Sequence, residues 1–304
     1  MTKRKTKKKI TAPLWFVLIL SAVLLFYYVM ETEEPAPESN LSNELPSQLT
    51  ISDSDFSIHM PELGNKFSGD CTLIKSGDIE ILIDAGSKTS SIDTVTAYID
   101  QYCTDKILEY VIVTHAHEDH YACFTIDNGS IFDIYECKTI IDFSQVEKGK
   151  EEQKMYNAYL SELNEEINNG AVHYTASECI QNNISVFNVS DSVTLEILDS
   201  EYYYNRSSSE NNHSVCCTVT YTDDSESKTF LFTGDLEKSG EKKLIQLNPQ
   251  LGEVFFYKAA HHGSSTSSCE ELLEVIKPQV VFVGCVAGSS EYSSKNESQV
   301  PTKE

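Results

Sequence analysis

Basic residues are scarce in this 304-residue sequence, which holds 23 Lys and Arg against 47 Asp and Glu and has a formal net charge of −24. Nucleic-acid-binding modules use Lys and Arg to replace phosphate counterions, so this balance argues against an ordinary module of that class. The 13 Gly and 8 Pro residues are too few for a collagen-like or low-complexity chain. With 40% hydrophobic and 10% aromatic residues, the composition is that of a folded globular protein.

The few basic residues are concentrated at the N-terminus, where acidic residues are absent. Six of the 23 lie in the first nine positions, and Glu31 is the first acidic residue of the chain. The remainder therefore holds 17 basic against 47 acidic residues, a formal charge of −30. The acidity belongs to the body of the protein, and residues 1–9 form a basic tail.

Residues 10–30 contain no charged side chain. At about 1.5 Å per residue, a helix of this length spans a hydrocarbon core of about 30 Å. The preceding basic residues predict a single-pass transmembrane signal anchor, with the N-terminus in the cytoplasm and the rest of the chain extracellular. A cleaved signal peptide is the alternative, although its apolar region is usually about 7–15 residues long. Residues 31–50, rich in Pro, Glu, Ser and Asn, predict a disordered linker to a domain over residues 51–304.

The nine cysteines form no Cys-x-x-C motif, and none precedes Cys71. Lipid attachment near the apolar segment is excluded because no acceptor cysteine is present there. The odd number leaves at least one cysteine unpaired. Several lie in apolar, strand-like segments, where cysteine behaves as a small buried hydrophobe. The sequence leaves the disulfide state open.

From Phe56 onward, strand-like and helical patterns alternate. Two β-rich segments, 71–76 and 79–84, flank a Gly-Asp turn and predict a hairpin. The clearest helix is predicted over 151–168, where apolar residues recur every three to four positions before Gly170. Further strands are predicted at 109–114, 138–143, 184–189, 193–198, 214–221, 229–233, 254–258 and 280–283, and further helices at 92–102, 238–247 and 269–276. Two successive blocks of strands and helices predict a layered α/β protein.

The densest group of chemistry-bearing side chains is the histidine string, residues 114–120, with the sequence Thr-His-Ala-His-Glu-Asp-His. Imidazoles and carboxylates are costly to crowd together unless a cation is bound between them, and they are ligands that Zn²⁺, Mn²⁺ and Fe accept. His115 and His117 can point one way while Asp119 and His120 turn towards a second position, which predicts two metals about 3.5–4 Å apart. A solvent-exposed, histidine-rich loop is the alternative.

Six motifs, in this order, resemble those of the metallo-β-lactamase superfamily, and more narrowly those of the hydrolase domain of ComEC-type DNA-uptake proteins. The motifs are Gly69-Asp70-Cys71-Thr72-Leu73-Ile74, Leu82-Ile83-Asp84-Ala85-Gly86, the histidine string, Asn211-Asn212-His213-Ser214-Val215, Phe232-Thr233-Gly234-Asp235 and His261-His262-Gly263-Ser264-Ser265-Thr266-Ser267. The resemblance covers residues 56–296. It implies a four-layer αββα sandwich and a hydrolase with two divalent metal ions, Zn²⁺ first and Mn²⁺ or Fe as alternatives.

By this resemblance, the expected metal ligands are His115, His117, Asp119, His120, His213, Asp235, His261 and His262. Asp235 would bridge the two metals. One of the two adjacent histidines would bind metal while the other donates a hydrogen bond to a substrate oxygen, and the sequence leaves their order open. His213 has equal weight as a ligand and as a loop residue. Asp119 and His262 are the expected catalytic residues, and Asp84 is expected to orient a ligand histidine through its other ring nitrogen.

The sequence departs from the ComEC-type pattern near its end. Val300 precedes Pro301, where that pattern has a histidine. Pro301 and Thr302 suit the start of a helix. Because the sequence ends at Glu304, we expect a C-terminal helix to be missing from it.

The predicted reaction is hydrolysis by a hydroxide bridging two metals, and no Gly-x-Ser-x-Gly segment supports a Ser-His-Asp hydrolase. The resemblance points to phosphodiester chemistry, including nuclease activity in competence. An acidic body repels a long polyanion. A small phosphodiester or a cell-envelope ester is therefore the expected substrate, and a nuclease or a low-turnover accessory protein in DNA uptake is the alternative. No protein partner follows from the sequence.

Overall fold

The computed structural model describes residues 56–224 and 226–286, which belong to one compact unit. The basic tail, the expected anchor at 10–30, the linker and the segment around Val300 lie outside the described residues. None of the helices in the described part of the chain has the length and apolar character that a membrane crossing requires.

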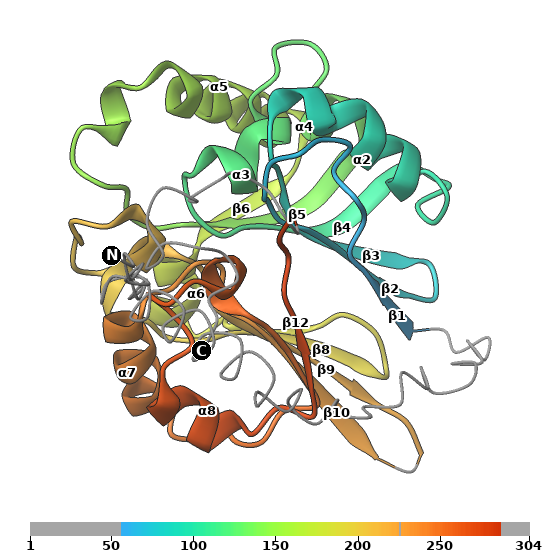
Figure 1. Ribbon diagram of the computed structural model, residues 1–304. Coiled ribbons are helices and arrows are strands. Elements are labelled where there is room, and N and C mark those ends of the chain that lie inside the picture. The colour runs from blue at the N-terminus through green and yellow to red at the C-terminus, as the bar shows by residue number, and fades with distance from the viewer. Residues whose placement is uncertain (1–55, 225, 287–304) are drawn as a thin grey trace, which may run out of the picture. The chain divides into compact units, whose positions relative to one another are not determined.

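Two six-stranded mixed sheets form the centre of this unit (Figure 1). The first has the order β1-β2-β3-β4-β5-β6, with strands Phe56–His59, Cys71–Ser76, Ile79–Ala85, Ile107–Val113, Glu136–Asp142 and Val172–Thr175. The second has the order β12-β11-β10-β9-β8-β7; in chain order, β7 to β12 are Val186–Asn188, Val193–Ile197, Cys217–Thr222, Ser227–Phe232, Phe256–Lys258 and Val280–Phe282.

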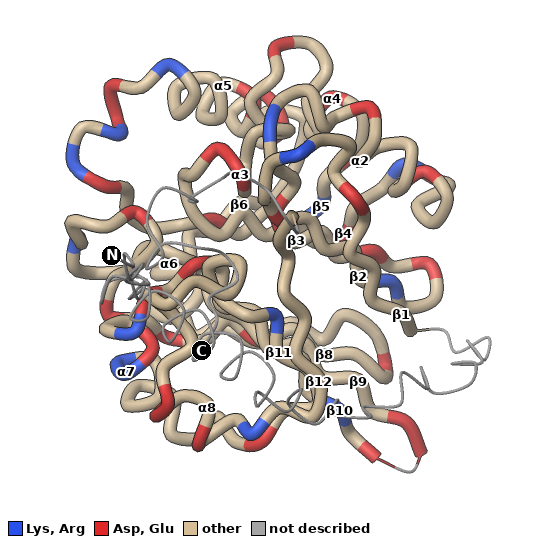
Figure 2. Tube along the Cα trace, viewed as in Figure 1, with Lys and Arg blue, Asp and Glu red and all other residues tan. Residues whose placement is uncertain are grey.

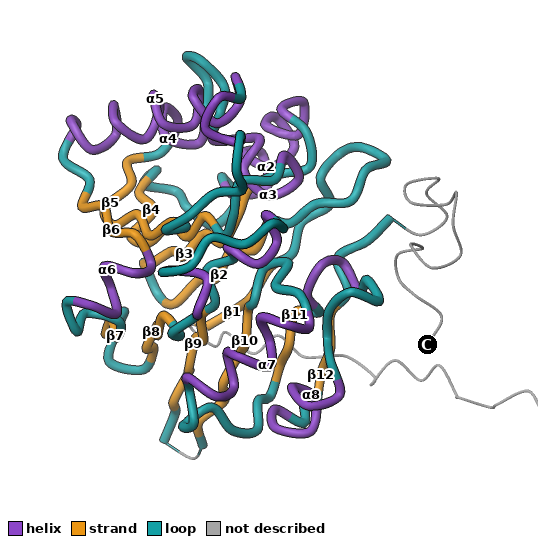
Figure 3. Tube along the Cα trace, turned by 90° about the vertical axis from the view of Figure 1, so that its left-hand side faces the viewer, coloured by secondary structure: helices purple, strands orange, loops and turns teal. Residues whose placement is uncertain are grey.

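Helices cover the outer faces of both sheets, which gives four layers in the order helix, sheet, sheet, helix (Figures 1 and 3). The helices are α2 (Ile92–Ile99), α3 (Glu118–Tyr121), α4 (Ile131–Ile134), α5 (Lys154–Asn169), α6 (Ala176–Gln181), α7 (Lys238–Leu247) and α8 (Glu270–Ile276). The first sheet carries α2, α4 and α5, and the second carries α7 and α8. The predicted layered α/β architecture is confirmed.

The predicted hairpin is present as β2 and β3, which pair in antiparallel fashion from Ser76 and Ile79 at the turn. Gly77 has φ 61 in this turn, a left-handed conformation that costs glycine little. From β3 to β6 the first sheet is parallel, as are β10 to β12 in the second. The carboxyl ends of neighbouring parallel strands therefore share an edge in each sheet.

The apolar core follows the strand and helix periods. In β8, Val193, Leu195 and Ile197 are buried while the residues between them are partly exposed. One buried cluster draws on both sheets and on α5, through Tyr159 and Leu163. A second, separate cluster includes apolar side chains of β10, β11, α7 and α8. Each sheet thus buries apolar side chains on both of its faces.

The predicted elements are present with shifted ends, and the differences have local causes. Helix α5 begins at Lys154 rather than at residue 151, because residues 150–152 form a 3₁₀ turn (η3) after Gly149, which has φ 86. The short helices α3, α4 and α6 were not predicted, because four to six residues are too few for a helical period to show.

His173 forms a structural ion pair in the first sheet. Its Nε2 lies 2.9 Å from Asp142 Oδ1, and Tyr159 donates to Asp142 Oδ2 at 2.9 Å. Burial is the largest single effect and opposes the charged imidazole, but the hydrogen bond with Asp142 and the negative charges of Asp142 and Glu178 together outweigh it and raise the pKa of His173.

A histidine with a raised pKa in the folded state stabilises that state below the unfolded-state pKa of about 6.5 and loses this contribution as pH rises through the folded-state value. We therefore predict that His173 makes the free energy of unfolding decrease as pH rises above 6.5. Urea unfolding at pH 6 and pH 8 measures this, with His173→Gln as the comparison. The same pH dependence in both proteins would contradict the prediction.

Candidate metal centre

The candidate site lies where strands of both sheets end. From the first sheet, Asp84 lies near the end of β3, and the histidine string follows β4 and enters α3. From the second sheet, Asp235 follows β10, and His261 and His262 follow β11 in the 3₁₀ turn η6 (Ala260–Gly263). The parallel pairing of β3 with β4 and of β10 with β11 brings these ends together within each sheet.

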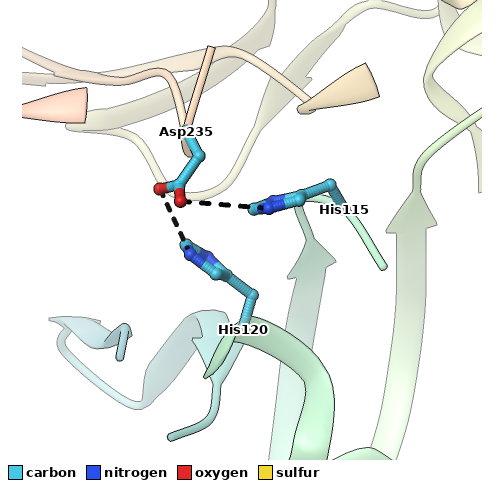
Figure 4. Close-up of side chains that lie close together, drawn as sticks. All are labelled: His115, His120 and Asp235. Carbon is cyan, nitrogen blue, oxygen red and sulfur yellow. Dashed lines mark ion pairs between the residues drawn. The ribbon is translucent and has the colours of Figure 1, made fainter. Parts of the chain in front are cut away.

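His115, His120 and Asp235 form one group of potential ligands (Figure 4). Asp235 Oδ1 lies 3.2 Å from His120 Nε2, and Asp235 Oδ2 lies 4.0 Å from His115 Nε2. All three side chains are buried. His117 joins this group, since its Nδ1 lies 3.1 Å from His115 Nε2.

Asp119, His120 and His262 form a second group that shares His120 with the first. His262 Nε2 lies 3.2 Å from Asp119 Oδ2 and 3.8 Å from Asp235 Oδ2. Asp235 thus lies between the two groups and is close to a histidine of each. This is the arrangement that a carboxylate shared by two metals requires.

Two buried atoms at the centre have no hydrogen-bond partner in the described residues: His120 Nε2 and Asp235 Oδ1. Leaving buried polar atoms unpaired costs free energy. A divalent cation between them would satisfy both, and imidazole nitrogens with carboxylate oxygens are suitable ligands for Zn²⁺, Mn²⁺ or Fe. The residues present therefore fit the metals that the sequence predicts.

Asp84 orients His120 from behind. Its Oδ2 accepts hydrogen bonds from His120 Nδ1 at 2.8 Å and from the Thr114 hydroxyl at 2.7 Å, and its Oδ1 accepts one from the Thr114 backbone N–H at 2.7 Å. This contact turns His120 Nε2 towards Asp235 and fixes the ring. Asp84 has φ 58, so the backbone adopts an uncommon conformation to place this carboxylate.

The structure distinguishes the two adjacent histidines that the sequence left open. His262 is fully buried; its Nδ1 lies 2.8 Å from the Gly284 carbonyl oxygen, and its Nε2 faces Asp119. The His261 side chain is 19% exposed, with Nδ1 2.8 Å from Thr266 Oγ1 and Nε2 3.9 Å from Asp235. The geometry favours His262 as a metal ligand and His261 as the histidine that can reach a substrate.

His213 is not brought into this arrangement. Its Nε2 accepts a hydrogen bond from the Ser207 backbone N–H at 2.9 Å, and its Nδ1 lies 3.6 Å from Glu210 Oε2. Within the described part of the chain, its ring forms no hydrogen bond or ion pair with the other candidate ligands. Of the two roles predicted for His213, the geometry favours the loop role.

Sequence reasoning missed the ion pair between Asp70 and Lys258, which is buried behind two candidate ligands. Asp70 Oδ2 lies 3.6 Å from His120 Nδ1, and Asp70 Oδ1 lies 3.5 Å from His262 Nδ1. A lysine at the end of the apolar strand β11 was the available signal, because buried lysines are rare unless they are paired.

The candidate histidines have opposite electrostatic environments. Burial is the main cause that lowers the pKa of His115 well below its ordinary value. Burial also opposes a charged His262, but the carboxylates of Asp235 and Asp70 outweigh it and raise the pKa of His262 to about 10. The carboxylates around His262 thus favour a positive charge at this position, which a metal ion can supply in place of a proton.

Residues 64–124 match the family model described as the metallo-beta-lactamase superfamily. This segment includes Asp84 and the histidine string, and so supplies ligand candidates from the first sheet. Members of the superfamily are typically metal-dependent hydrolases and commonly bind two divalent ions, usually zinc. The prediction of a metal-dependent hydrolase is confirmed at this level. The narrower ComEC-type resemblance stays a prediction.

Among solved structures, the chain is similar to the metallo-beta-lactamase fold protein YhfI from Bacillus subtilis, with 16% identity over 67% of this chain and 71% of that chain and a TM-score of 0.36. It is also similar to MEM-A1, a subclass B3 metallo-beta-lactamase from a soil metagenome library (14% identity, 68% and 78% covered, TM-score 0.39). It is similar to the Rm3 metallo-beta-lactamase as well, with 12% identity over 70% of this chain and 78% of that chain and a TM-score of 0.42. No curated protein matches the sequence.

We predict that Asp235→Asn lowers the metal content of the purified chain from about two ions to fewer than one, because both groups of ligands lose their shared charge. Inductively coupled plasma mass spectrometry measures the content. Asp127→Asn, a substitution of the same kind at an exposed position, should retain both ions. Two ions bound to Asp235→Asn would contradict this assignment.

A second prediction concerns the buried ion pair. Lys258→Met leaves Asp70 buried without its countercharge, which should lower the free energy of unfolding by about 3–5 kcal/mol. Adding Asp70→Asn should recover most of this loss, because the uncompensated charge is removed. Urea titration of both single variants and the double variant tests the coupling, and simple additivity of the two losses would contradict it.

Proposed function

We propose that this chain is a dinuclear metal hydrolase that acts on a phosphodiester or on a small cell-envelope ester. The observation that carries the proposal is the convergence of His115, His120, His262 and Asp235 from two sheets, with unpartnered buried atoms at the centre. The family match supports hydrolysis. The order of the ComEC-type motifs supports phosphodiesters over other substrates.

Two divalent ions, when bound, supply a hydroxide at neutral pH and stabilise negative charge on the substrate. His115 and His117 would hold one ion. Asp119, His120 and His262 would hold the other ion, and Asp235 would contribute to both. Asp84 keeps the His120 ring in the orientation that binding needs. With its Nδ1 on Thr266, His261 can donate a hydrogen bond from Nε2 to a substrate oxygen on the exposed side of the site.

We also propose that the hydrolase is anchored in the cell membrane by residues 10–30 and works outside the cell. The charge-free segment between a basic tail and an acidic body supports this topology. An extracellular active site close to the membrane suits a substrate from the cell envelope.

The second candidate is a ComEC-like nuclease or a low-turnover accessory protein in DNA uptake. The order of the six motifs favours it. The acidic body opposes it, because a long nucleic acid would meet excess negative charge along its length.

The full chain, loaded with Zn²⁺ or Mn²⁺, should hydrolyse bis-p-nitrophenyl phosphate or a small ester, and His117→Ala should lower kcat/KM by at least about 100-fold. His59→Ala is the matched control, since His59 contacts Tyr98 and Tyr102 rather than the site. Removal of the metal should abolish activity, and its return should restore it. Stoichiometric metal with no turnover on a panel of esters and phosphodiesters would favour the accessory protein, and preferential cleavage of DNA would favour the nuclease.

A further inference from the structure

Most basic side chains of the described residues are paired with carboxylates. Those in ion pairs are Lys75, Lys88, Lys106, Lys138, Arg206, Lys228, Lys242, Lys243, Lys258 and Lys277. Lys148, Lys150 and Lys154 have no ion pair or side-chain hydrogen bond within the described part of the chain. Three unpaired lysines therefore lie in one short segment of an acidic protein: Lys148 and Lys150 on the loop between β5 and α5, and Lys154 at the first residue of α5. Figure 2 shows basic residues gathered along this loop.

This loop is fastened to the histidine string by Glu210. The Glu210 carboxylate is buried and accepts hydrogen bonds from the backbone N–H of Ala116 at 3.0 Å and from that of Glu147 at 2.6 Å. Ala116 separates the candidate ligands His115 and His117. The start of the lysine-bearing loop is thus held, through one carboxylate, against the backbone of the metal centre.

Lys150 follows this attachment by one tight turn. Its backbone N–H donates to the Glu147 carbonyl at 3.0 Å, and Gly149 supplies the left-handed residue of the turn with φ 86. Lys150 is partly buried, whereas Lys148 and Lys154 are exposed. Of the three unpaired lysines, Lys150 is therefore the one held at the surface of the fold rather than extended into solvent.

The acidic neighbours on this loop leave Lys150 uncompensated. Glu151 pairs with Arg206 at 2.6 Å and accepts from the Gly149 N–H, and Glu152 is exposed. Burial lowers the pKa of His117, Asp119 opposes this, and the charge of Lys150 lowers it further. The charge of Lys150 thus acts on the His117 ring from the loop that Glu210 fastens to Ala116.

We propose that Lys150 binds the negatively charged phosphate group of the substrate and so gives the site its preference for a small phosphodiester over a neutral ester. This inference rests on the proposed function. A diester phosphate carries one negative charge, which matches one unpaired ammonium on a loop fastened to the backbone of the histidine string. A long nucleic acid needs a row of basic residues along its phosphates, which an acidic protein does not offer, whereas a small diester needs only one cation. A single lysine is therefore sufficient for a small diester even in an acidic protein.

The test uses dimethyl phosphate as an inert diester, titrated calorimetrically into the metal-loaded full chain. Lys150→Gln should weaken its binding roughly 10- to 100-fold, the range expected for loss of one hydrogen bond to a charged group. Lys150→Arg should retain binding within a few-fold. Lys106→Gln is the matched control, because it removes the same charge at the opposite end of β4 from the histidine string.

Kinetics separates binding from chemistry. Lys150→Gln should raise KM for bis-p-nitrophenyl phosphate while kcat changes little, and KM for the neutral ester p-nitrophenyl acetate should stay constant. Equal metal content in all variants establishes that the centre is intact. Lys150→Met serves the same comparison if Lys150→Gln does not fold.

Unchanged binding of dimethyl phosphate to Lys150→Gln would overturn the inference, as would equal weakening by Lys106→Gln, because the effect would then come from net charge. Absence of binding to the unsubstituted chain would also overturn it. Lys150-dependent binding without turnover on any ester or diester would support the role of Lys150 while overturning the proposed hydrolase function. The two proposals therefore fail in different ways.

Discussion

The structure depends on the buried carboxylate of Asp235, which comes from the second sheet and faces histidines of the first. Its backbone N–H donates to Ser214 Oγ at 3.0 Å, and the neighbouring Val215 N–H donates to the Thr114 carbonyl at 2.9 Å. These bonds join the ends of β4, β9 and β10 at one point. The two sheets thus bring together ligands that lie more than a hundred residues apart in the chain.

Such close approach requires space that only glycine leaves. A Cβ on Gly86 would lie 2.7 Å from backbone atoms of Asp119 and His120, and one on Gly234 would lie 2.7 Å from Ser214 Oγ. Gly234 also has φ 53, which L side chains rarely adopt. Both glycines belong to motifs that contain an aspartate of the site. Each motif therefore contains an aspartate of the site and a glycine, and the glycine leaves the space that the neighbouring loop needs to lie close to that aspartate.

The same packing concentrates negative charge in the interior. Asp84 and Asp235 are buried almost completely, and Asp70 lies beside them with Lys258 as its countercharge. Buried carboxylates are tolerated only when they are paired, hydrogen-bonded or bound to a cation. Asp70 is paired with Lys258, and Asp84 accepts hydrogen bonds from Thr114, whereas Asp235 Oδ1 accepts no hydrogen bond from the described residues. This difference identifies Asp235 as the carboxylate where a metal gains most.

The sequence predicted features whose residues lie close together along the chain, and it did not predict contacts between residues that lie far apart along it. The histidine string, the β2–β3 hairpin and helix α7 are set by residues within about ten positions of one another, where periodicity and spacing carry information. Asp70 with Lys258 and Glu210 with Ala116 are contacts between distant segments. The lysine at the end of β11 is a local signal that some partner is present, but local spacing does not show which residue the partner is. For His213, the motif left a ligand role and a loop role equally open, and the surrounding loop bonds its ring away from the site. Local patterns thus predicted residue types, and only the packing of the two sheets determined their partners.

The distribution of charge limits which substrates the fold can favour. At physiological salt, fields from exposed charges are largely screened beyond about 8 Å, so most of the acidic surface acts weakly on a molecule already at the metal centre. A polymer experiences that surface along its whole length, whereas a small diester experiences only its nearest neighbours. Among the described residues, Lys150 is a cation without an ion pair whose charge acts on His117 and whose loop is held by Glu210, and we propose it as one of those neighbours. The net charge of −24 therefore disfavours long polyanions far more than a substrate with a single phosphate.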